Sequence, residues 1–132
     1  MNITTCKKNI GIVIIGRNEG QRLIRCLDSL KGLNVECKHI VYVDSGSNDG
    51  SQAAAEKFGA ICLRLDMTLP FSAARARNEG WRYLAQHHSD IEFIQFIDGD
   101  CLLQANWLPA ALQHLVNTPN VAIVCGRRRE LH

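Results

Sequence analysis

The sequence lacks the features that mark membrane, fibrous or disordered chains. Its longest strongly apolar run, at residues 12–15, is far shorter than the ~20 residues that a membrane-spanning helix needs. Ten Gly and three Pro among 132 residues exclude a collagen-like or low-complexity chain. Hydrophobic residues make up 46% and charged residues 21%, which is ordinary globular composition. We therefore expect one soluble, cytoplasmic domain over residues 1–132, with no integral membrane segment.

A large excess of charge is also missing. The formal net charge is only +2, which is too mild to indicate nucleic acid or an anionic membrane as a partner. The arginines at 127–129 could contact phosphate, but a terminal run of this kind is usually solvated.

Cysteine pairs with metal-binding spacing are absent, although the chain has six cysteines. Cys26, Cys62 and Cys125 fall inside apolar patterns, where a reduced cysteine behaves as a small hydrophobe. We expect buried or half-exposed free thiols rather than disulfides or zinc ligands. The histidines show no metal-binding motif either, since His87 and His88 simply close a helix. The remaining cysteines are at positions 6, 37 and 101.

Apolar segments alternate between strand-like and helix-like patterns. This order favours a parallel, doubly wound α/β sheet with helices on both faces. Its polar connections at 16–19, 44–51 and 98–100 follow strands, and in such sheets ligands bind beyond the carboxyl ends of the strands. The predicted strands are 10–15, 39–43, 60–63, 91–97 and 121–125, and the predicted helices lie between Asn18 and Gly32, between Asp49 and Gly59, over roughly 71–87, and around 108–115.

Two helix starts have the spacing of a capping box. Asn18 precedes Gln21 by three residues, and Asp49 precedes Gln52 by three. In the first helix, the apolar side chains at 23, 24, 27 and 30 form one stripe and predict its buried face.

The triplet Asp98-Gly99-Asp100 is the first candidate site. With seven aspartates in the chain, some Asp-x-Asp arises by chance in about one chain in three, so the bare match is weak. Its position at the end of an apolar strand is more informative, because carboxylates there suit a hard divalent cation such as Mg²⁺ or Mn²⁺. Gly99 would let a phosphate or sugar approach the backbone. The alternative is a simple turn in which Asp98 caps local amides.

Asp44 also follows an apolar strand directly, and a carboxylate there can accept hydrogen bonds from a base or a ribose. The plain alternative is a turn. Arg77 lies near the start of the third helix, where it could pair with phosphate, whereas we favour a solvated position for Arg75. Gly80, inside the same helix, indicates either close packing or a tolerated defect.

Several common catalytic patterns are missing. No phosphate-binding loop of the form G-x-x-x-x-G-K-[ST] is present, and Gly16-Arg17-Asn18-Glu19-Gly20 does not fit the dinucleotide pattern G-x-G-x-x-G. No serine or cysteine nucleophile with a partner histidine is legible.

Four segments in order resemble the amino-terminal half of a family 2 glycosyltransferase of the GT-A fold. The resemblance covers nearly the whole chain. The segments are Val13-Ile14-Ile15-Gly16-Arg17-Asn18-Glu19, Val43-Asp44-Ser45-Gly46-Ser47-Asn48-Asp49-Gly50-Ser51, Ala76-Arg77-Asn78-Glu79-Gly80 and Phe96-Ile97-Asp98-Gly99-Asp100.

The resemblance implies sugar transfer from a nucleotide-sugar donor of the UDP or GDP type, with Mn²⁺ or Mg²⁺ and inversion at the sugar. It assigns the nucleoside to Asp44, the base or diphosphate to Arg77, the ribose or sugar and part of the metal site to Asp98, and the metal to Asp100. The other donor-binding positions that it implies are Gly16, Arg17, Asn18, Glu19, Ser45 and Gly99.

The chain departs from the family pattern in three ways. Ile15-Gly16-Arg17-Asn18 stands where many members have Pro-Thr-Tyr-Asn, and Ser45 replaces a second aspartate. Only 32 residues follow Asp100, whereas the resemblance implies that the acceptor site and the general base come well after this aspartate, so we expect both to be absent from this chain and nominate no catalytic base. We expect this chain alone to bind donor and to transfer sugar poorly.

Two alternative functions stay open from the sequence. One is a non-catalytic nucleotide-binding or interaction fragment of such an enzyme, and the other is a different α/β nucleotide enzyme, such as a sugar nucleotidyltransferase. The missing half would also leave apolar surface that a homo-oligomer could bury.

Overall fold

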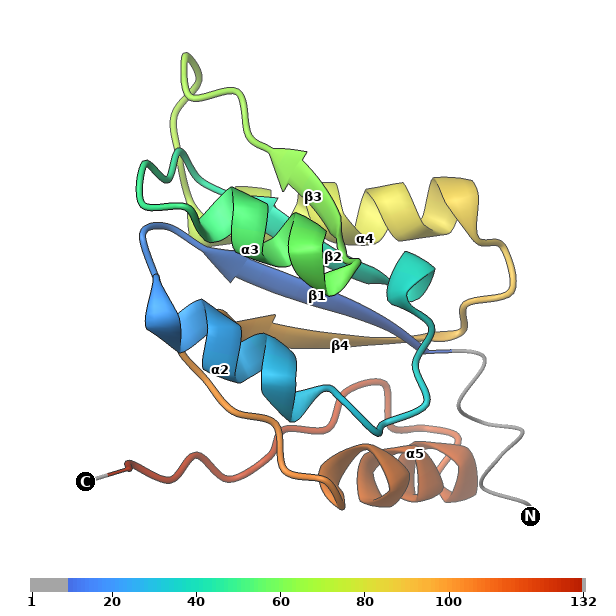
Figure 1. The fold of residues 1–132 in the computed structure, drawn as a ribbon. Helices are drawn as coiled ribbons and strands as arrows, with labels where there is room; N and C mark the ends of the chain where they lie inside the picture. The colour runs from blue at the N-terminus through green and yellow to red at the C-terminus, as the bar shows by residue number, and fades with distance from the viewer. Residues whose placement is uncertain (1–9, 132) are drawn as a thin grey trace.

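The computed structural model describes residues 10–131, which form a four-stranded sheet with helices on both faces (Figure 1). The strand order is β3-β2-β1-β4 and every pairing is parallel, so the expected doubly wound α/β class is confirmed. The strands are β1 (Ile10–Gly16), β2 (Ile40–Asp44), β3 (Ile61–Arg64) and β4 (Phe93–Asp98), and the helices are α2 (Gln21–Ser29), α3 (Ser51–Phe58), α4 (Ala73–His87) and α5 (Trp107–Asn117), with a short 3-10 turn, η2 (Cys37–His39), before β2.

The central strand β1 is buried on both faces. Ile12 and Ile14 pack in a cluster with side chains from α2, α3 and α5, whereas Val13 and Ile15 pack in a second cluster with α4. A strand covered on both sides has no solvent face, and this explains why its sequence is continuously apolar and β-branched instead of alternating.

Helix α4 lies unusually close to the sheet at Gly80. A Cβ added to Gly80 would stand 2.4 Å from Cγ1 of Val13 and 3.1 Å from Cγ2 of Val43. Of the two interpretations that the sequence left for Gly80, close packing is therefore confirmed.

The predicted helix caps at Asn18 and Asp49 are wrong. Helix α2 begins after Gly20 without a side-chain cap, because Asn18 adopts a left-handed backbone (φ 51°) and its Oδ1 accepts a hydrogen bond from the backbone N–H of Asn48. Helix α3 begins after Gly50, and Asp49 Oδ1 accepts from the backbone N–H and the hydroxyl of Ser51. A long-range contact to the loop after β2 thus took the Asn18 oxygen, whereas a contact two residues away took the Asp49 oxygen.

The predicted stripe on the first helix is only partly buried. Leu23, Leu27 and Leu30 lie in the core, but Ile24 is 37% exposed. The neighbouring Cys26 takes a fully buried position instead.

The fifth predicted strand, at 121–125, is also wrong. This segment has no regular secondary structure and pairs with no strand among residues 10–131. Ile123 is 77% exposed, and a Cβ on Gly126 would lie 3.3 Å from the ring of Trp107 in α5. The segment therefore runs over α5 instead of extending the sheet beside β4, and an apolar run without a ladder partner does not become a strand.

The burial of the cysteines depends on which of the predicted elements form. All five described cysteines are free thiols, as expected. Cys26 is buried, which raises the pKa of its thiol to about 12, but Cys125 is exposed because its expected strand does not form. Cys6 lies outside the described residues. Within residues 10–131, no helix is both long enough and apolar enough to cross a bilayer.

Candidate functional site

Three strands end together at one edge of the sheet. In the strand register Gly16 lies opposite Asp44, and Ile15 lies opposite Asp98. Strand order reverses between β1 and β4, which is the place where α/β sheets bind ligands. The predicted meeting of the three polar loops is confirmed, and we call residues 16–20, 44–51 and 98–101 the carboxyl edge.

The loops after β1 and β2 are joined by hydrogen bonds at the carboxyl edge. The backbone N–H of Asn18 donates to Ser47 Oγ at 2.8 Å, and the N–H of Asn48 donates back to Asn18 Oδ1 at 2.8 Å. The N–H of Ser45 donates to the Gly16 carbonyl at 3.0 Å. Asn18 therefore holds two loops together, which is a role that the sequence pattern did not indicate.

Asp44 is fully buried and its carboxylate accepts four hydrogen bonds from the protein. Oδ1 accepts from the Tyr42 hydroxyl at 2.8 Å, and Oδ2 accepts from the backbone N–H groups of Gly46 (3.1 Å) and Ser47 (2.8 Å) and from Gln52 Nε2 (2.7 Å). Burial by itself raises the pKa of Asp44, but the hydrogen bonds from Ser47, Gln52 and Tyr42 outweigh burial and hold the pKa below its usual value.

This network has a consequence for ligand binding. The carboxylate of Asp44 is ionised and organises the loop after β2, so it reaches a ligand only when that loop moves. Ser45 is likewise buried, at 2% exposure. The sequence pattern did not indicate Tyr42 and assigned Gln52 to a helix cap, yet both donate hydrogen bonds to the carboxylate of Asp44.

Gly99 and Gly16 leave space that the side chain of Glu19 occupies. A Cβ on Gly99 would lie 3.2 Å from the Ile15 carbonyl and 3.4 Å from Glu19 Cγ, and the N–H of Gly99 donates to that carbonyl at 2.8 Å. A Cβ on Gly16 would lie 3.0 Å from the same Glu19 carbon. The two glycines thus let Glu19 fold over the ends of β1 and β4, which is an internal reason for glycine that the sequence did not reveal.

Arg77 meets Asp98 across the carboxyl edge. Its Nη2 lies 3.1 Å from Asp98 Oδ1, with side chains 40% and 54% exposed. An exposed pair of this kind contributes only ~0–1 kcal/mol to stability, so a phosphate could displace it at little cost. Arg75, by contrast, donates to the Asp66 carbonyl at 2.8 Å, away from this pair.

Negative charge is concentrated around Glu19. Burial raises the pKa of Glu19 most, Arg22 (Nε 3.1 Å from Oε2) lowers it in part, and the charges of Asp100, Asp49 and Asp98 raise it further. Glu19 Oε2 is also buried, and its contact with Arg22 is an ion pair without the geometry of a hydrogen bond, so within residues 10–131 this oxygen accepts none. The carboxyl edge therefore carries more carboxylate charge than its own arginines neutralise locally.

The carboxylates fit a hard divalent cation. Asp100 is exposed, and from the described residues it accepts just a weak hydrogen bond from Cys101 Sγ, at 3.5 Å. Oxygen donors are what Mg²⁺ and Mn²⁺ prefer, and Mg²⁺ commonly takes one or two carboxylates together with phosphates and water. Among residues 10–131, three His, Cys, Asp or Glu ligand atoms do not come together at this edge, so a cation here would take further ligands from a phosphate or from water.

Arg17 completes the predicted positions. It is exposed and, within the described part of the chain, makes no hydrogen bond or ion pair. It is therefore available to an anion at this edge.

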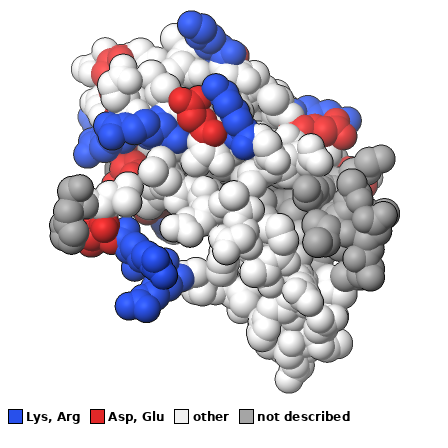
Figure 2. All heavy atoms as spheres, turned by 60° about the horizontal axis from the view of Figure 1, so that its bottom comes forward, with Lys and Arg blue, Asp and Glu red and all other residues white. Residues whose placement is uncertain are grey.

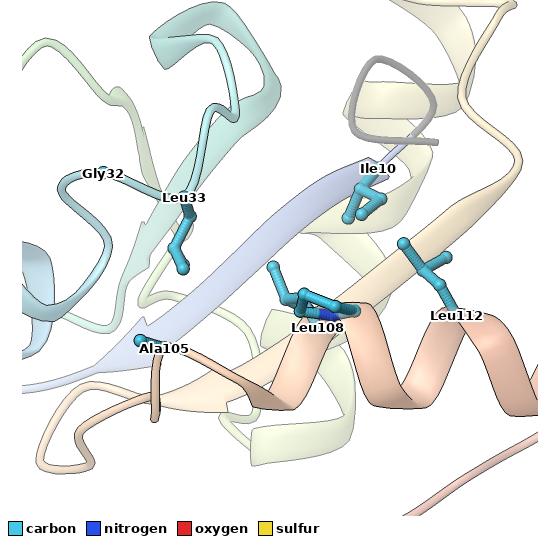
Figure 3. A pocket seen from close by; sticks show the side chains of 7 residues that line it. Ile10, Gly32, Leu33, Ala105, Leu108 and Leu112 are labelled. Carbon is cyan, nitrogen blue, oxygen red and sulfur yellow. The ribbon is translucent and has the colours of Figure 1, made fainter. Parts of the chain in front are cut away.

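Two hollows among the described residues lie away from the carboxyl edge. One is an apolar cavity of about 50 Å³ between the start of β1 and α5, lined by Ile10, Leu33, Leu108 and Leu112 among others (Figure 3). The other is a cleft of about 630 Å³ beside α2 and α3. Neither is lined by a predicted site residue, and the first is far smaller than the roughly 300–1,000 Å³ of ligand pockets.

The parallel sheet and its carboxyl edge define an α/β domain of the GT-A class, as its solved structural neighbours also indicate. The chain belongs to the family described as "Glycosyl transferase family 2", which matches residues 11–131. A relative, the pre-mycofactocin glycosyltransferase of Mycobacterium tuberculosis, is 34% identical over 123 residues, covering 91% of this chain and 23% of the relative.

Two solved structures share the fold. Glucosyl-3-phosphoglycerate synthase from Mycobacterium tuberculosis, in complex with Mn²⁺, UDP and glucosyl-3-phosphoglycerate, has a TM-score of 0.65 at 22% identity, over 87% of this chain and 44% of that one. A mannosyltransferase from Pyrobaculum calidifontis, in complex with GDP-Man and Mn²⁺, has a TM-score of 0.69 at 19% identity, over 92% and 36%. The chain thus spans less than half the length of the proteins that it matches.

Proposed function

We propose that this chain forms the donor-binding part of a metal-dependent, inverting glycosyltransferase that uses a nucleotide sugar of the UDP or GDP type. The observation that carries the proposal is the alignment of Gly16, Asp44 and Asp98 at one edge, with Arg77 across from them, in a family 2 chain. The nucleotides present in the two similar structures, UDP and GDP-Man, support the donor class.

Each part of the carboxyl edge has a proposed task. The diphosphate displaces Asp98 from Arg77, so that the guanidinium binds phosphate oxygens while Asp98 turns to the sugar and the metal. Asp44 and Ser45 contact the nucleoside after the loop that covers them moves. Gly16, Arg17, Asn18, Glu19 and Gly99 form the floor on which the donor lies.

Asp100, with Asp98, is proposed to hold Mn²⁺ or Mg²⁺. A bound cation would neutralise the charge that develops on the departing nucleoside diphosphate. It would also relieve the repulsion that raises the pKa of Glu19. The general base and the acceptor site are proposed to belong to sequence outside this chain, which is why we nominate no catalytic base.

We also propose a cytoplasmic location and self-association. The five free thiols described in the structure suit a reducing compartment.

Side chains of Leu102, Val116 and Ile123 are exposed by 46%, 39% and 77%. Figure 2 shows a broad uncharged area on the side of the molecule that is lowest in Figure 1. Sedimentation velocity tests self-association: Ile123→Asp is expected to shift the chain toward monomer, whereas a wild-type monomer at every concentration contradicts it.

The experiment that tests donor binding is a thermal-shift screen of UDP-glucose and GDP-mannose, with and without Mn²⁺. A donor at 100 times its Kd stabilises the fold by ~2.7 kcal/mol if it binds only the folded chain. We expect stabilisation that requires Mn²⁺ and that Asp100→Asn abolishes. Asp28→Asn, which alters an exposed pair with Lys31 on α2, is the matched control.

Two outcomes separate this function from the alternatives. Equal binding without Mn²⁺ would contradict the role of Asp100. Donor binding without sugar transfer, when the chain is joined to the remaining length of a family 2 enzyme, would favour a non-catalytic binding fragment instead.

A further inference from the structure

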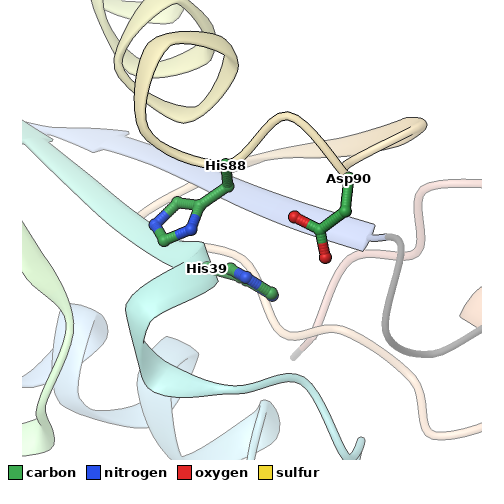
Figure 4. Close-up of side chains that lie close together, drawn as sticks. All are labelled: His39, His88 and Asp90. Carbon is green, nitrogen blue, oxygen red and sulfur yellow. The ribbon is translucent and has the colours of Figure 1, made fainter.

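Two histidines and an aspartate meet at the edge of the sheet opposite to the carboxyl edge. His39 ends η2, just before β2, while His88 follows α4 and Asp90 lies in the turn that leads to β4 (Figure 4). The turn is fixed by its backbone, since the N–H of His88 donates to the Leu84 carbonyl at 2.8 Å and the N–H of Ile91 donates to the His88 carbonyl at 3.2 Å. Residues 49 positions apart in the sequence thus come together through the parallel pairing of the strands.

The imidazole of His39 is buried without a partner for one of its nitrogens. The residue is 2% exposed, and its Nδ1 has no hydrogen-bond partner among residues 10–131. A buried polar atom left unpaired is costly, and almost all such atoms in folded proteins have a partner. The ring of His88 stands nearly edge-on to that of His39, with centroids 4.6 Å apart.

The three side chains can supply one ligand atom each, and these atoms all lie within 4.8 Å of one another. Ligands at about 2.0–2.1 Å from a tetrahedral Zn²⁺ stand roughly 3.3 Å apart. The cluster must therefore close by somewhat more than 1 Å. His88 is half-buried and Asp90 is exposed, so these two side chains can move toward the fixed imidazole of His39.

We propose that His39, His88 and Asp90 bind Zn²⁺ and that the ion ties the start of β2 to the start of β4 across β1. Two imidazoles and one carboxylate are a donor set that zinc accepts, with water in the fourth position. The same set is poor for Mn²⁺ or Mg²⁺, which prefer oxygen ligands. The site is separate from the carboxyl edge and acts on stability, and it does not depend on the proposed donor binding.

The test is a calorimetric titration of the metal-free, reduced 132-residue chain with Zn²⁺. We expect one high-affinity equivalent and a zinc-dependent rise in the unfolding temperature. His88→Gln and Asp90→Asn should each weaken binding at least about tenfold and remove the thermal shift. The matched controls are His87→Gln, whose ring already contacts the Tyr83 carbonyl at 2.8 Å, and Glu92→Gln, an exposed acid two residues after Asp90.

Co²⁺ substitution separates this site from the thiols. Histidine and carboxylate ligation is expected to give a visible cobalt spectrum without the ultraviolet charge-transfer band that a thiolate produces. Absence of zinc binding, a thiolate band, or equal affinity in His88→Gln and Asp90→Asn would each overturn the proposal. Since Asp100→Asn removes only donor-dependent stabilisation, failure of the zinc site and failure of the donor site give different results.

Discussion

Gly80→Ala tests the close packing of α4 on the sheet. The new Cβ would stand 2.4 Å from Val13 Cγ1, roughly 1 Å inside the ~3.5–4.0 Å at which carbon atoms pack. Val13 and Val43 are both fully buried, so neither valine can turn toward solvent. Overpacking of this kind typically costs 1–3 kcal/mol, while alanine gains at most ~1 kcal/mol of helix propensity over glycine.

We therefore expect Gly80→Ala to lower the free energy of unfolding by up to about 2 kcal/mol, since a packing cost of about 1–3 kcal/mol is offset by only about 1 kcal/mol of helix propensity. At this chain length the unfolding temperature should fall by roughly 3–5 °C for each kcal/mol. The assay is urea unfolding followed by circular dichroism, with an unchanged dependence on denaturant as the condition for comparing midpoints.

Val13→Ala, combined with Gly80→Ala, tests whether contact with Val13 causes this loss of stability. Val13→Ala removes the two Val13 methyl groups, including the nearest one at 2.4 Å, leaves Val43 Cγ2 at 3.1 Å, and by itself costs about 2–3 kcal/mol. In that background Gly80→Ala should become neutral or stabilising, which gives a coupling energy of roughly 1–3 kcal/mol between the two sites. If Gly80→Ala stabilises the otherwise unchanged protein, or costs the same in both backgrounds, α4 does not approach the sheet as closely as described.

Three further predictions follow from the buried groups. Asp44→Asn leaves at least one of its buried donors, such as the Tyr42 hydroxyl, without an acceptor and should cost ~2–4 kcal/mol near pH 7. The pKa of Asp44 is lowered in the folded protein. The stability that its ionised carboxylate supplies is therefore complete above the unfolded pKa and is lost as the pH falls through the folded pKa. The urea midpoints of wild type and Asp44→Asn should converge in acid, and a gap that stays constant would contradict this. The pKa of Glu19 is raised in the folded protein, so its ionisation opposes folding above the unfolded pKa. In the absence of divalent metal, Glu19→Gln should therefore stabilise the chain near pH 7 but not near pH 4. Equal effects of the substitution at the two pH values would refute this. Cys26, buried and with a raised pKa, should resist alkylation in the native protein while the exposed Cys125 is labelled, as peptide mapping would show, and early labelling of Cys26 would argue against its burial.

Sequence patterns were most reliable where burial is continuous or where backbone geometry demands glycine. The apolar runs at 10–15 and 39–43 correspond to β1 and β2, and Gly59 ends α3 as expected. They failed at 121–125, where the segment runs over α5 and leaves the outer edge of β4 unpaired by any residue in 10–131, because an apolar sequence alone does not decide which surface it packs on. They also failed at the caps of α2 and α3, where Asn18 bonds the distant Asn48 and Asp49 bonds the nearby Ser51 instead of capping the helix.

At the carboxyl edge, too, some features could be predicted from the sequence and others could not. A strand followed by Asp44 or by Asp98 could be read from the sequence, and parallel pairing then required the two ends to meet. The hydrogen bond from Tyr42 to Asp44 was accessible in principle, because residues two apart in a strand share a face. The burial of Asp44, by contrast, depends on a loop conformation that no local pattern specifies.

The α/β class, the family and the positions of the polar loops could be predicted from the sequence, because these depend on periodicity and on residues close together in the chain. Which side chains contact one another within the protein became visible only in the folded chain. The fold buries Asp44 among four donors, pairs Arg77 with Asp98, fits Glu19 over two glycines and brings His39 to His88 and Asp90. The physical reason is that contacts between distant segments are set by strand register and close packing, and these arise only when the whole sheet has formed.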